Sequence, residues 1–261
     1  MNKKNIIISL LILILTGCQE KSDTQIENII PYYKQELENR YQSYKDKNPN
    51  LTEEEIITNV NIGLDSPFYT NTKQTDLSNH ITLLTNKYLY LPEDYIPKNL
   101  ESINKNFTNG TKQLVKEAKI AFEKMATDAK QEGYNIRAIS AYRSYSYQQV
   151  LYQKYVLNDG PEKADTYSAR PGFSEHQTGL VVDIDNIKRD FNNFESTEEF
   201  KWMTNNAHDY GFILRYPKGK EHITGYQYEA WHYRYVGEKI AKNIKKENTT
   251  YDEYYIKYLD N

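Results

Sequence analysis

The stretch Ser174-Glu-His-Gln-Thr-Gly-Leu-Val-Val-Asp183 joins polar, potentially metal-binding side chains to the start of an apolar strand. Gly179 permits a bend, and the apolar residues 180–184 after it are predicted to form a β-strand. On that strand Asp183 shares a face with Val181, so the carboxylate has apolar neighbours. Burying a carboxylate is costly unless a positive group pairs with it. The stretch therefore predicts a strand whose acid lies beside a cation.

A second motif, Glu229-Ala-Trp-His232, lies further along the chain. It adds a histidine and a glutamate to His176 and Asp183. Catalytic zinc sites commonly use three protein ligands and leave one position open for water. A nearby carboxylate can take the proton of that water and produce a nucleophile. We interpret His176, Asp183 and His232 as candidate ligands of one Zn²⁺, and Glu229 as the candidate base.

His176, Asp183 and His232 are each better explained as surface residues when taken alone, and only their combination with Glu229 indicates a site. Asp185 is an alternative ligand, but it is expected on the same strand face as Asp183 and farther along, so we rank it behind Asp183. The remaining histidines have no such context, and we interpret them as surface or structural residues. They are His80, His208 and His222.

The first residues have the pattern of an export signal. Lys3 and Lys4 precede an apolar run at 6–15, which is too short for a membrane-spanning helix of roughly 20 residues. Leu15-Thr-Gly-Cys18 follows and resembles the bacterial lipobox, in which the cysteine receives lipid. The only cysteine is Cys18, so no disulfide and no thiolate metal site is expected. An ordinary signal peptide is the alternative. We expect a lipoprotein anchored at the outer face of the bacterial cytoplasmic membrane.

Composition limits the partners and the domain organisation. The net charge of −3 arises from 33 basic and 36 acidic residues without a basic block, so no nucleic-acid partner is expected. The 25 tyrosines could line a groove for a polar polymer, or reflect codon bias. We expect a monomer with a signal peptide at 1–17, a tether and N-terminal extension at 18–75, a catalytic domain at 76–240 and a C-terminal tail at 241–261.

The pattern of elements is mixed. Helices are predicted at 29–40, 41–44, 111–133, 146–157 and 198–210. The segment 53–60 leads into a predicted short strand at 61–65, and further strands are predicted at 136–142, 180–184, 212–216 and 228–235. Thr111 is the predicted N-cap of the clearest helix, and Gly133 ends it. Residues 88–100 are predicted to be an extended loop because prolines interrupt them. The order favours an α+β fold, with helices packed on a small antiparallel sheet that carries a single zinc site.

The two motifs, Ser174-x-His176-x-x-Gly179-x-x-x-Asp183 and Glu229-x-x-His232, are similar to those of the zinc D-alanyl-D-alanine carboxypeptidases of VanY type and the related zinc L,D-carboxypeptidases. The similarity extends over roughly 76–240 and includes the stretches 141–145, 168–172, 211–219 and 231–237. Val181 replaces a frequent alanine, and Phe173 stands where some relatives have histidine. These departures change packing and the groove rim, but not the ligand set.

The resemblance implies a role for each site residue. It implies that His176, Asp183 and His232 bind zinc, and that Glu229 acts as general base and then as acid. Arg143 would lie near the scissile carbonyl and the terminal carboxylate, a task that suits a guanidinium. The resemblance further implies that Gln148 and Ser174 bind the carboxy-terminal residue of the substrate. Arg170 would either orient the loop before the site or contact ligand.

The expected reaction is hydrolysis of one peptide bond that releases D-alanine from a peptidoglycan stem peptide. The sequence leaves open whether the bond is D,D or L,D. One alternative is a zinc endopeptidase that cuts within the stem or cross-link. Another is a non-catalytic wall-binding lipoprotein with structural zinc, against which Glu229 argues, because a closed structural site has no use for an unliganded base.

Overall fold

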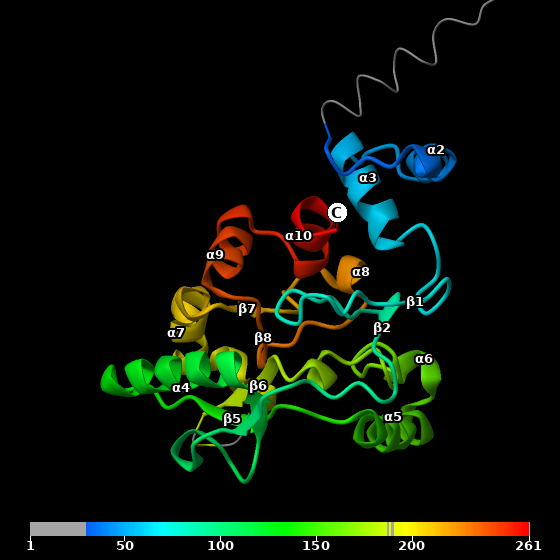
Figure 1. Ribbon diagram of the computed structural model, residues 1–261. Coiled ribbons are helices and arrows are strands. Elements are labelled where there is room, and N and C mark those ends of the chain that lie inside the picture. Colours follow the sequence, from blue (N-terminus) through cyan, green and yellow to red (C-terminus); the bar gives the residue numbers. More distant parts are fainter. Residues whose placement is uncertain (1–29, 187, 189–190, 261) are drawn as a thin grey trace, which may run out of the picture.

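The computed structural model describes residues 30–186, 188 and 191–260. Its central element is a four-stranded antiparallel sheet with the order β5-β6-β8-β7. The strands are β5 (Arg137–Ser140), β6 (Val181–Asp185), β7 (Phe212–Leu214) and β8 (His232–Tyr235). The helices and this small antiparallel sheet confirm the predicted α+β class (Figure 1).

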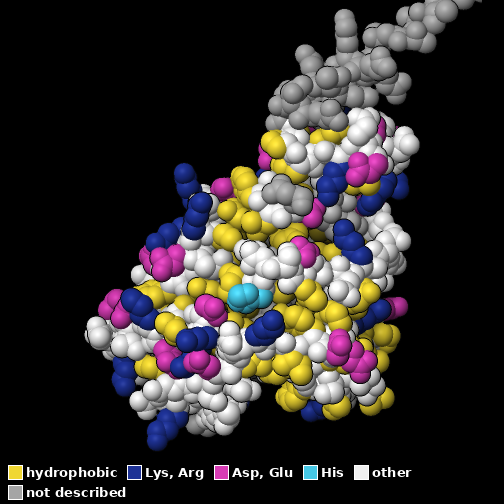
Figure 2. Space-filling view, viewed as in Figure 1, with side chains coloured by type: hydrophobic (Ala, Val, Ile, Leu, Met, Phe, Trp, Pro, Cys, Tyr) yellow, Lys and Arg dark blue, Asp and Glu magenta, His cyan; other side chains and the backbone are white. Residues whose placement is uncertain are grey.

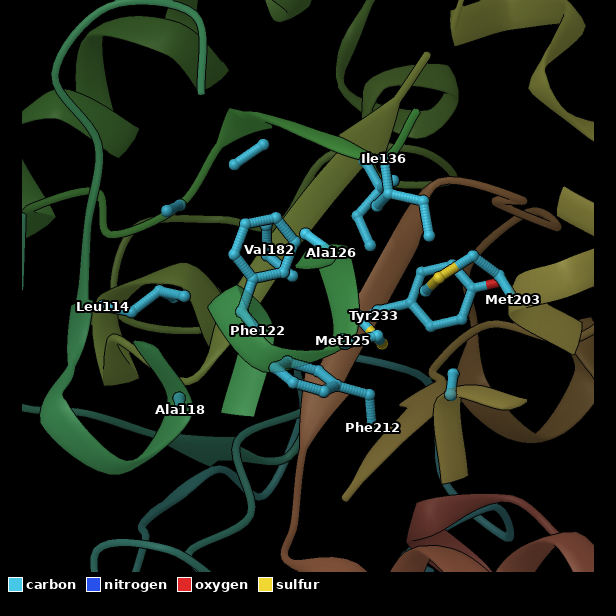
Figure 3. Close-up of a cluster of buried hydrophobic side chains, with 14 of the residues drawn as sticks. Leu114, Ala118, Phe122, Met125, Ala126, Ile136, Val182, Met203, Phe212 and Tyr233 are labelled. Carbon is cyan, nitrogen blue, oxygen red and sulfur yellow. The ribbon is translucent and has the colours of Figure 1, made fainter. Parts of the chain in front are cut away.

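Helix α4 (Lys116–Gln131) covers one face of the sheet and supplies much of the main core. Figure 3 shows Phe122 of α4 among side chains from the sheet, including Val182, Phe212 and Tyr233. Phe122, Val182 and Phe212 are fully buried. The apolar residues of β6 are thus held from this side, which fixes the strand that carries Asp183.

Helix α7 (Glu198–Asn206) and η5 (Ala207–Tyr210) adjoin this core, and η4 (Phe191–Ser196) precedes them. Away from α4 lie α5 (Tyr145–Asp159) and α6 (Pro161–Ala164). The other short elements are η2 (Lys105–Phe107), η3 (Glu175–Thr178) and α8 (Glu221–Thr224).

The predicted helix 111–133 begins later than expected. Residues 113–115 form β4 (Gln113–Val115), which pairs antiparallel with β3 (Leu100–Ser102). Val115 occupies the N-cap position of α4, so the prediction of Thr111 as N-cap is wrong. A strand pairing with a distant segment here overrides the local helical pattern.

The predicted strand 61–65 is also wrong. Helix α3 (Glu53–Ile62) begins with a capping box between Thr52 and Glu55 and continues to Ile62. Gly63, at φ +109°, then ends it in a left-handed conformation that glycine adopts readily. Within 88–100, only β2 (Leu89–Tyr90) and the first residue of β3 are strand, and β2 pairs with β1 (Lys73–Gln74).

The N-terminal extension is folded where the structure describes it. After η1 (Gln35–Leu37), helices α2 (Glu38–Lys47) and α3 pack together over a small apolar cluster. The helix predicted to start at 29 therefore begins later, and Cys18 lies outside the described residues. Within the described part of the chain, no helix is both long and apolar enough to cross a membrane.

The segment expected as a C-terminal tail contains ordered helices, α9 (Glu238–Glu247) and α10 (Tyr251–Tyr258). Thr250 and Glu253 form a capping box at the start of α10. Lys257 of α10 pairs with Glu54 of α3 at 2.6 Å, which links the last described helix to the N-terminal extension. On the face shown in Figure 2, basic and acidic side chains are interspersed.

Candidate metal centre

The sheet register brings two of the predicted ligands together. Asp183 on β6 lies directly opposite His232 on β8. His176 comes from η3, just before Gly179, which adopts a left-handed φ of +68° and turns the chain into β6. All three side chains are buried, and one ligand atom from each lies within 4.8 Å of the others. No other cluster of this kind occurs in the part of the chain that the structure describes.

Each imidazole approaches one oxygen of the Asp183 carboxylate at a distance that is compatible with binding the same metal ion. His176 Nε2 is 3.3 Å from Asp183 Oδ2, and His232 Nδ1 is 3.3 Å from Asp183 Oδ1. A tetrahedral Zn²⁺ with bonds of about 2.0–2.1 Å separates its ligand atoms by roughly 3.3–3.4 Å. Buried Asp183 Oδ1 has no hydrogen-bond partner among the described residues. This orphaned oxygen, together with two imidazoles, is a suitable donor set for zinc.

A backbone carbonyl fixes the orientation of His176. Its Nδ1 lies 2.7 Å from the Ala141 carbonyl oxygen, to which a protonated Nδ1 donates. Metal-binding histidines are usually held in this way, which leaves the other nitrogen free as a ligand. Burial, reinforced by the positive charge of Arg143, lowers the pKa of His176 to about 4. His176 is therefore neutral at neutral pH, as a metal ligand must be.

The charges of the other two ligands favour a cation between them. Burial alone would raise the pKa of Asp183, but His176, His232 and Arg143 hold it well below its usual range. Burial would lower the pKa of His232, but Asp183, Glu175 and Glu229 raise it well above its usual value. The carboxylates around His232 thus favour positive charge at this point, which a bound metal ion would supply.

Glu229 lies in the turn that leads into β8, so the predicted strand 228–235 begins only at His232. Its Oε2 is 3.3 Å from His232 Nδ1, the nitrogen that faces Asp183. Burial raises the pKa of Glu229, and the nearby Asp183 carboxylate adds to this effect. A carboxylate with a raised pKa beside a metal is suited to take up and return a proton.

The centre opens into a cavity of about 420 Å³. The cavity is lined by the three candidate ligands, by Glu229, by all predicted substrate-binding residues and by several aromatic side chains. The predicted substrate-binding residues are Arg143, Gln148 and Ser174, and the aromatic ones are Tyr155, Tyr167, Tyr216, Tyr226 and Trp231. A polar centre with an aromatic wall is typical of a small-molecule or peptide site.

Two of the predicted substrate-binding residues have defined surroundings. Gln148 is buried on α5, and its Nε2 donates to the Ala169 carbonyl at 2.8 Å. Its Oε1 is buried and has no hydrogen-bond partner in the described structure, and the residue lines the cavity. Arg143 donates from Nη2 to Asp183 Oδ2 at 2.7 Å and from Nε to Ser140 Oγ at 3.0 Å. Its guanidinium thus lies beside the carboxylate of the candidate ligand Asp183.

The remaining predicted candidates lie outside the centre. Asp185, at the end of β6, is not part of the metal-binding cluster. Arg170 pairs with Asp165 at 2.7 Å and lies over the ring of Tyr69, which agrees with a role in orienting the loop. His80, His208 and His222 are also absent from the cluster.

The sequence analysis missed Glu175, although it lies within the first motif. Its side chain is buried at the wall of the cavity and pairs with Arg215 at 2.9 Å and with Arg234 at 3.1 Å. The signal that could have indicated Glu175 was its position, because this charged residue directly precedes the candidate ligand His176 and comes shortly before a strand that is predicted to be buried. Its partners lie far away in the sequence, Arg215 directly after β7 and Arg234 in β8, so the sequence pattern did not reveal the pairing.

Comparisons with known proteins agree with this site. The family model for VanY, a D-alanyl-D-alanine carboxypeptidase, matches residues 111–238. The putative carboxypeptidase YodJ of Bacillus subtilis (strain 168) is 42% identical over 212 residues, which cover 76% of this chain and 78% of YodJ.

Two solved structures are similar as well. The LdcB LD-carboxypeptidase matches with a TM-score of 0.66 and 42% identity, over 72% of this chain and 91% of that chain. A VanY D,D-pentapeptidase from a VanB-type vancomycin-resistance cassette, in complex with Zn(II), matches with a TM-score of 0.59 and 29% identity, over 67% of this chain and 99% of that chain.

The fold and these relatives define a peptidase of the carboxypeptidase class. The chain belongs to the VanY family of D-alanyl-D-alanine carboxypeptidases and their L,D-carboxypeptidase relatives.

Proposed function

We propose that this protein is a zinc-dependent carboxypeptidase that releases the terminal D-alanine of peptidoglycan stem peptides. The observation that carries the proposal is that His176, Asp183 and His232 lie together in one cluster. Glu229 is in contact with His232 of this cluster. A Zn²⁺ ion bound by the three residues would act as a Lewis acid and lower the pKa of a water molecule. The zinc complex of the VanY pentapeptidase supports this choice of metal.

In the proposed reaction, Glu229 accepts the proton of the attacking water and later donates it to the leaving amine of D-alanine. Both transfers require a carboxyl group that changes its protonation state readily, and its raised pKa supports this role. The Arg143 guanidinium binds the terminal carboxylate or the developing oxyanion. Gln148 Oε1, which lacks a partner among the described residues, accepts a hydrogen bond from the substrate.

We further propose that the bond cleaved is of the L,D type. The identity to LdcB is 42% and that to a DacB L,D-carboxypeptidase of Streptococcus pneumoniae is 40%, whereas that to the VanY D,D-pentapeptidase is 29%. The choice between L,D and D,D cleavage depends on the shape of the groove around the residue before the scissile bond. Higher sequence identity to the L,D-carboxypeptidases supports a groove of the L,D type.

Product analysis by mass spectrometry tests the proposed function. Purified protein with zinc should remove one D-alanine from tetrapeptide stems, and pentapeptide stems should react more slowly. Faster release from pentapeptides would instead assign D,D activity. Two larger fragments in place of free D-alanine would contradict a carboxypeptidase and indicate an endopeptidase.

Replacing Arg143 with alanine should mainly impair substrates that have a free terminal carboxylate. A charge-assisted hydrogen bond contributes about 1.5–3 kcal/mol, so we expect kcat/KM to fall by roughly 10–100-fold. On a carboxamide-blocked peptide the loss should be much smaller. Zinc content must be measured in parallel, because Arg143 also contacts Asp183. Arg40→Ala, in the N-terminal extension, is the control, and an equal loss on both peptides would argue against carboxylate recognition.

The position of the enzyme is a further part of the proposal. Leu15-Thr-Gly-Cys18 supports lipid attachment at Cys18 and anchoring at the outer face of the cytoplasmic membrane. This location would bring the cavity close to its substrate. Recovery of Cys18→Ala in the membrane fraction at the wild-type level would argue against the anchor.

A further inference from the structure

Four charged side chains form a buried chain behind the metal centre. Glu175, Arg215, Arg234 and Asp252 are each at most 1% exposed. Arg215 donates from Nε to Glu175 Oε1 at 2.9 Å and from Nη1 to Asp252 Oδ2 at 2.6 Å. Arg234 donates from Nη1 to the same Glu175 oxygen at 3.1 Å. Two carboxylates and two guanidiniums balance each other's charge, as a group buried this deeply requires.

This charged chain ends at a metal ligand. Glu175 Oε2 is 3.7 Å from His232 Nε2, and neither atom has a hydrogen-bond partner among the described residues. His232 presents Nδ1 to Asp183, so Nε2 must carry the ring hydrogen when Nδ1 binds metal. A carboxylate facing that N–H fixes the tautomer and the ring orientation of a metal-binding histidine. Glu175 occupies this position at 3.7 Å, which is longer than a hydrogen bond, so at this distance its carboxylate favours the N–H on Nε2 electrostatically.

The other end of the charged chain lies on the last helix. Asp252 is on α10, and its Oδ1 accepts a hydrogen bond from Asn86 Nδ2 at 2.8 Å. Asp252 holds one arm of the Arg215 guanidinium, and this leaves Nε directed at Glu175. Without the Asp252 charge, the two arginines would share a single carboxylate, and that carboxylate would be drawn toward them and away from His232. The orientation of Glu175 thus depends on a residue of α10.

We infer that Asp252 is a positioning residue for the metal ligand His232 and acts on it through Arg215 and Glu175. The inference rests on the proposed zinc-dependent function. It makes the C-terminal helix part of the support of the site, although α10 contributes no residue to the lining of the cavity.

Zinc affinity of the full-length protein, measured by competition with a chelator, tests the inference. Changing a residue that orients a metal ligand typically weakens metal binding 10–100-fold. We expect Asp252→Asn to weaken zinc binding about 10-fold, and Glu175→Gln to weaken it at least as much. If Asp252 acts through Glu175, the double variant should bind zinc no more weakly than Glu175→Gln alone. Multiplicative losses in the double variant would overturn the inference.

A second readout separates positioning from general destabilisation. Ligand binding raises the melting temperature by an amount that depends on its affinity for the folded state. Asp252→Asn should therefore show a smaller zinc-induced rise than the wild type. Tyr251→Phe is the matched control, because it removes the hydrogen bond from α10 to the Thr82 carbonyl and leaves the charged chain intact. It should lower the melting temperature with and without zinc and keep the wild-type affinity.

If Asp252→Asn does not fold, Arg215→Lys takes its place. Lysine keeps the buried positive charge but lacks the fork that spans both carboxylates. It should weaken zinc binding in the same direction, and unchanged zinc affinity in this variant or in Asp252→Asn would overturn the inference. A wild-type protein that binds no zinc would instead contradict the proposed function itself.

Discussion

Replacing Glu229 with glutamine is expected to lower kcat by about 10²–10⁴-fold, the usual contribution of general acid–base catalysis. Glutamine has nearly the same shape but cannot accept the proton of the attacking water at neutral pH. It should therefore leave the cavity, the zinc content and the fold intact. Steady-state release of D-alanine measures the loss, and elemental analysis and circular dichroism check the metal and the fold.

The exposed Glu162 on α6 provides a matched control, because Glu162→Gln removes the same charge away from the cavity. It should retain wild-type turnover. A Glu229→Gln variant that contains zinc and hydrolyses substrate at the normal rate would show that another residue is the base. Loss of zinc together with activity would show that Glu229 acts mainly in metal binding.

Replacing His232 with alanine should abolish stoichiometric zinc binding. The variant loses a ligand and leaves the buried Asp183 carboxylate with fewer positive partners. We therefore expect the affinity for zinc to fall by more than about 100-fold. This loss exceeds the usual effect of changing a residue that only orients a ligand. Activity should fall with the metal content. The measurements are zinc per chain after dialysis and the dissociation constant from chelator competition.

His80 is the control for this experiment, since its side chain is exposed and lies outside the ligand cluster. His80→Ala should bind zinc as the wild type does. Unchanged zinc content in His232→Ala would remove His232 from the ligand set. Excess zinc should restore part of the activity if His176 and Asp183 still bind the ion weakly.

The candidate centre could be predicted from the sequence because its residues lie in two short motifs. His176 and Asp183 are separated by a glycine turn, and His232 lies opposite Asp183 in the sheet. The support behind the centre could not be predicted in the same way. Glu175 and Asp252 meet through Arg215, and neither periodicity nor spacing indicates that residues so far apart in sequence share one buried group.

Contacts between separate segments of the sequence also explain why parts of the predicted fold were wrong. Strands 180–184 and 212–216 are apolar runs and were found nearly in place as β6 and β7. The hairpin of β3 and β4 instead depends on pairing with another segment, and the helical pattern of 111–133 concealed it. Residues 61–65 showed no signal strong enough to distinguish a strand from a helix end and turn.

The order of the sheet determines when the site can form during biosynthesis. Among the strands of the described residues β8 comes last in the sequence, yet it lies between β6 and β7 and contributes His232. A chain that stops before residue 232 has no strand to join these two, and it lacks one of the three candidate ligands. Fragments that stop before residue 232, whether from stalled synthesis or from proteolysis, would therefore be inactive rather than partly active, and hydrolysis would begin only in chains that extend past this residue.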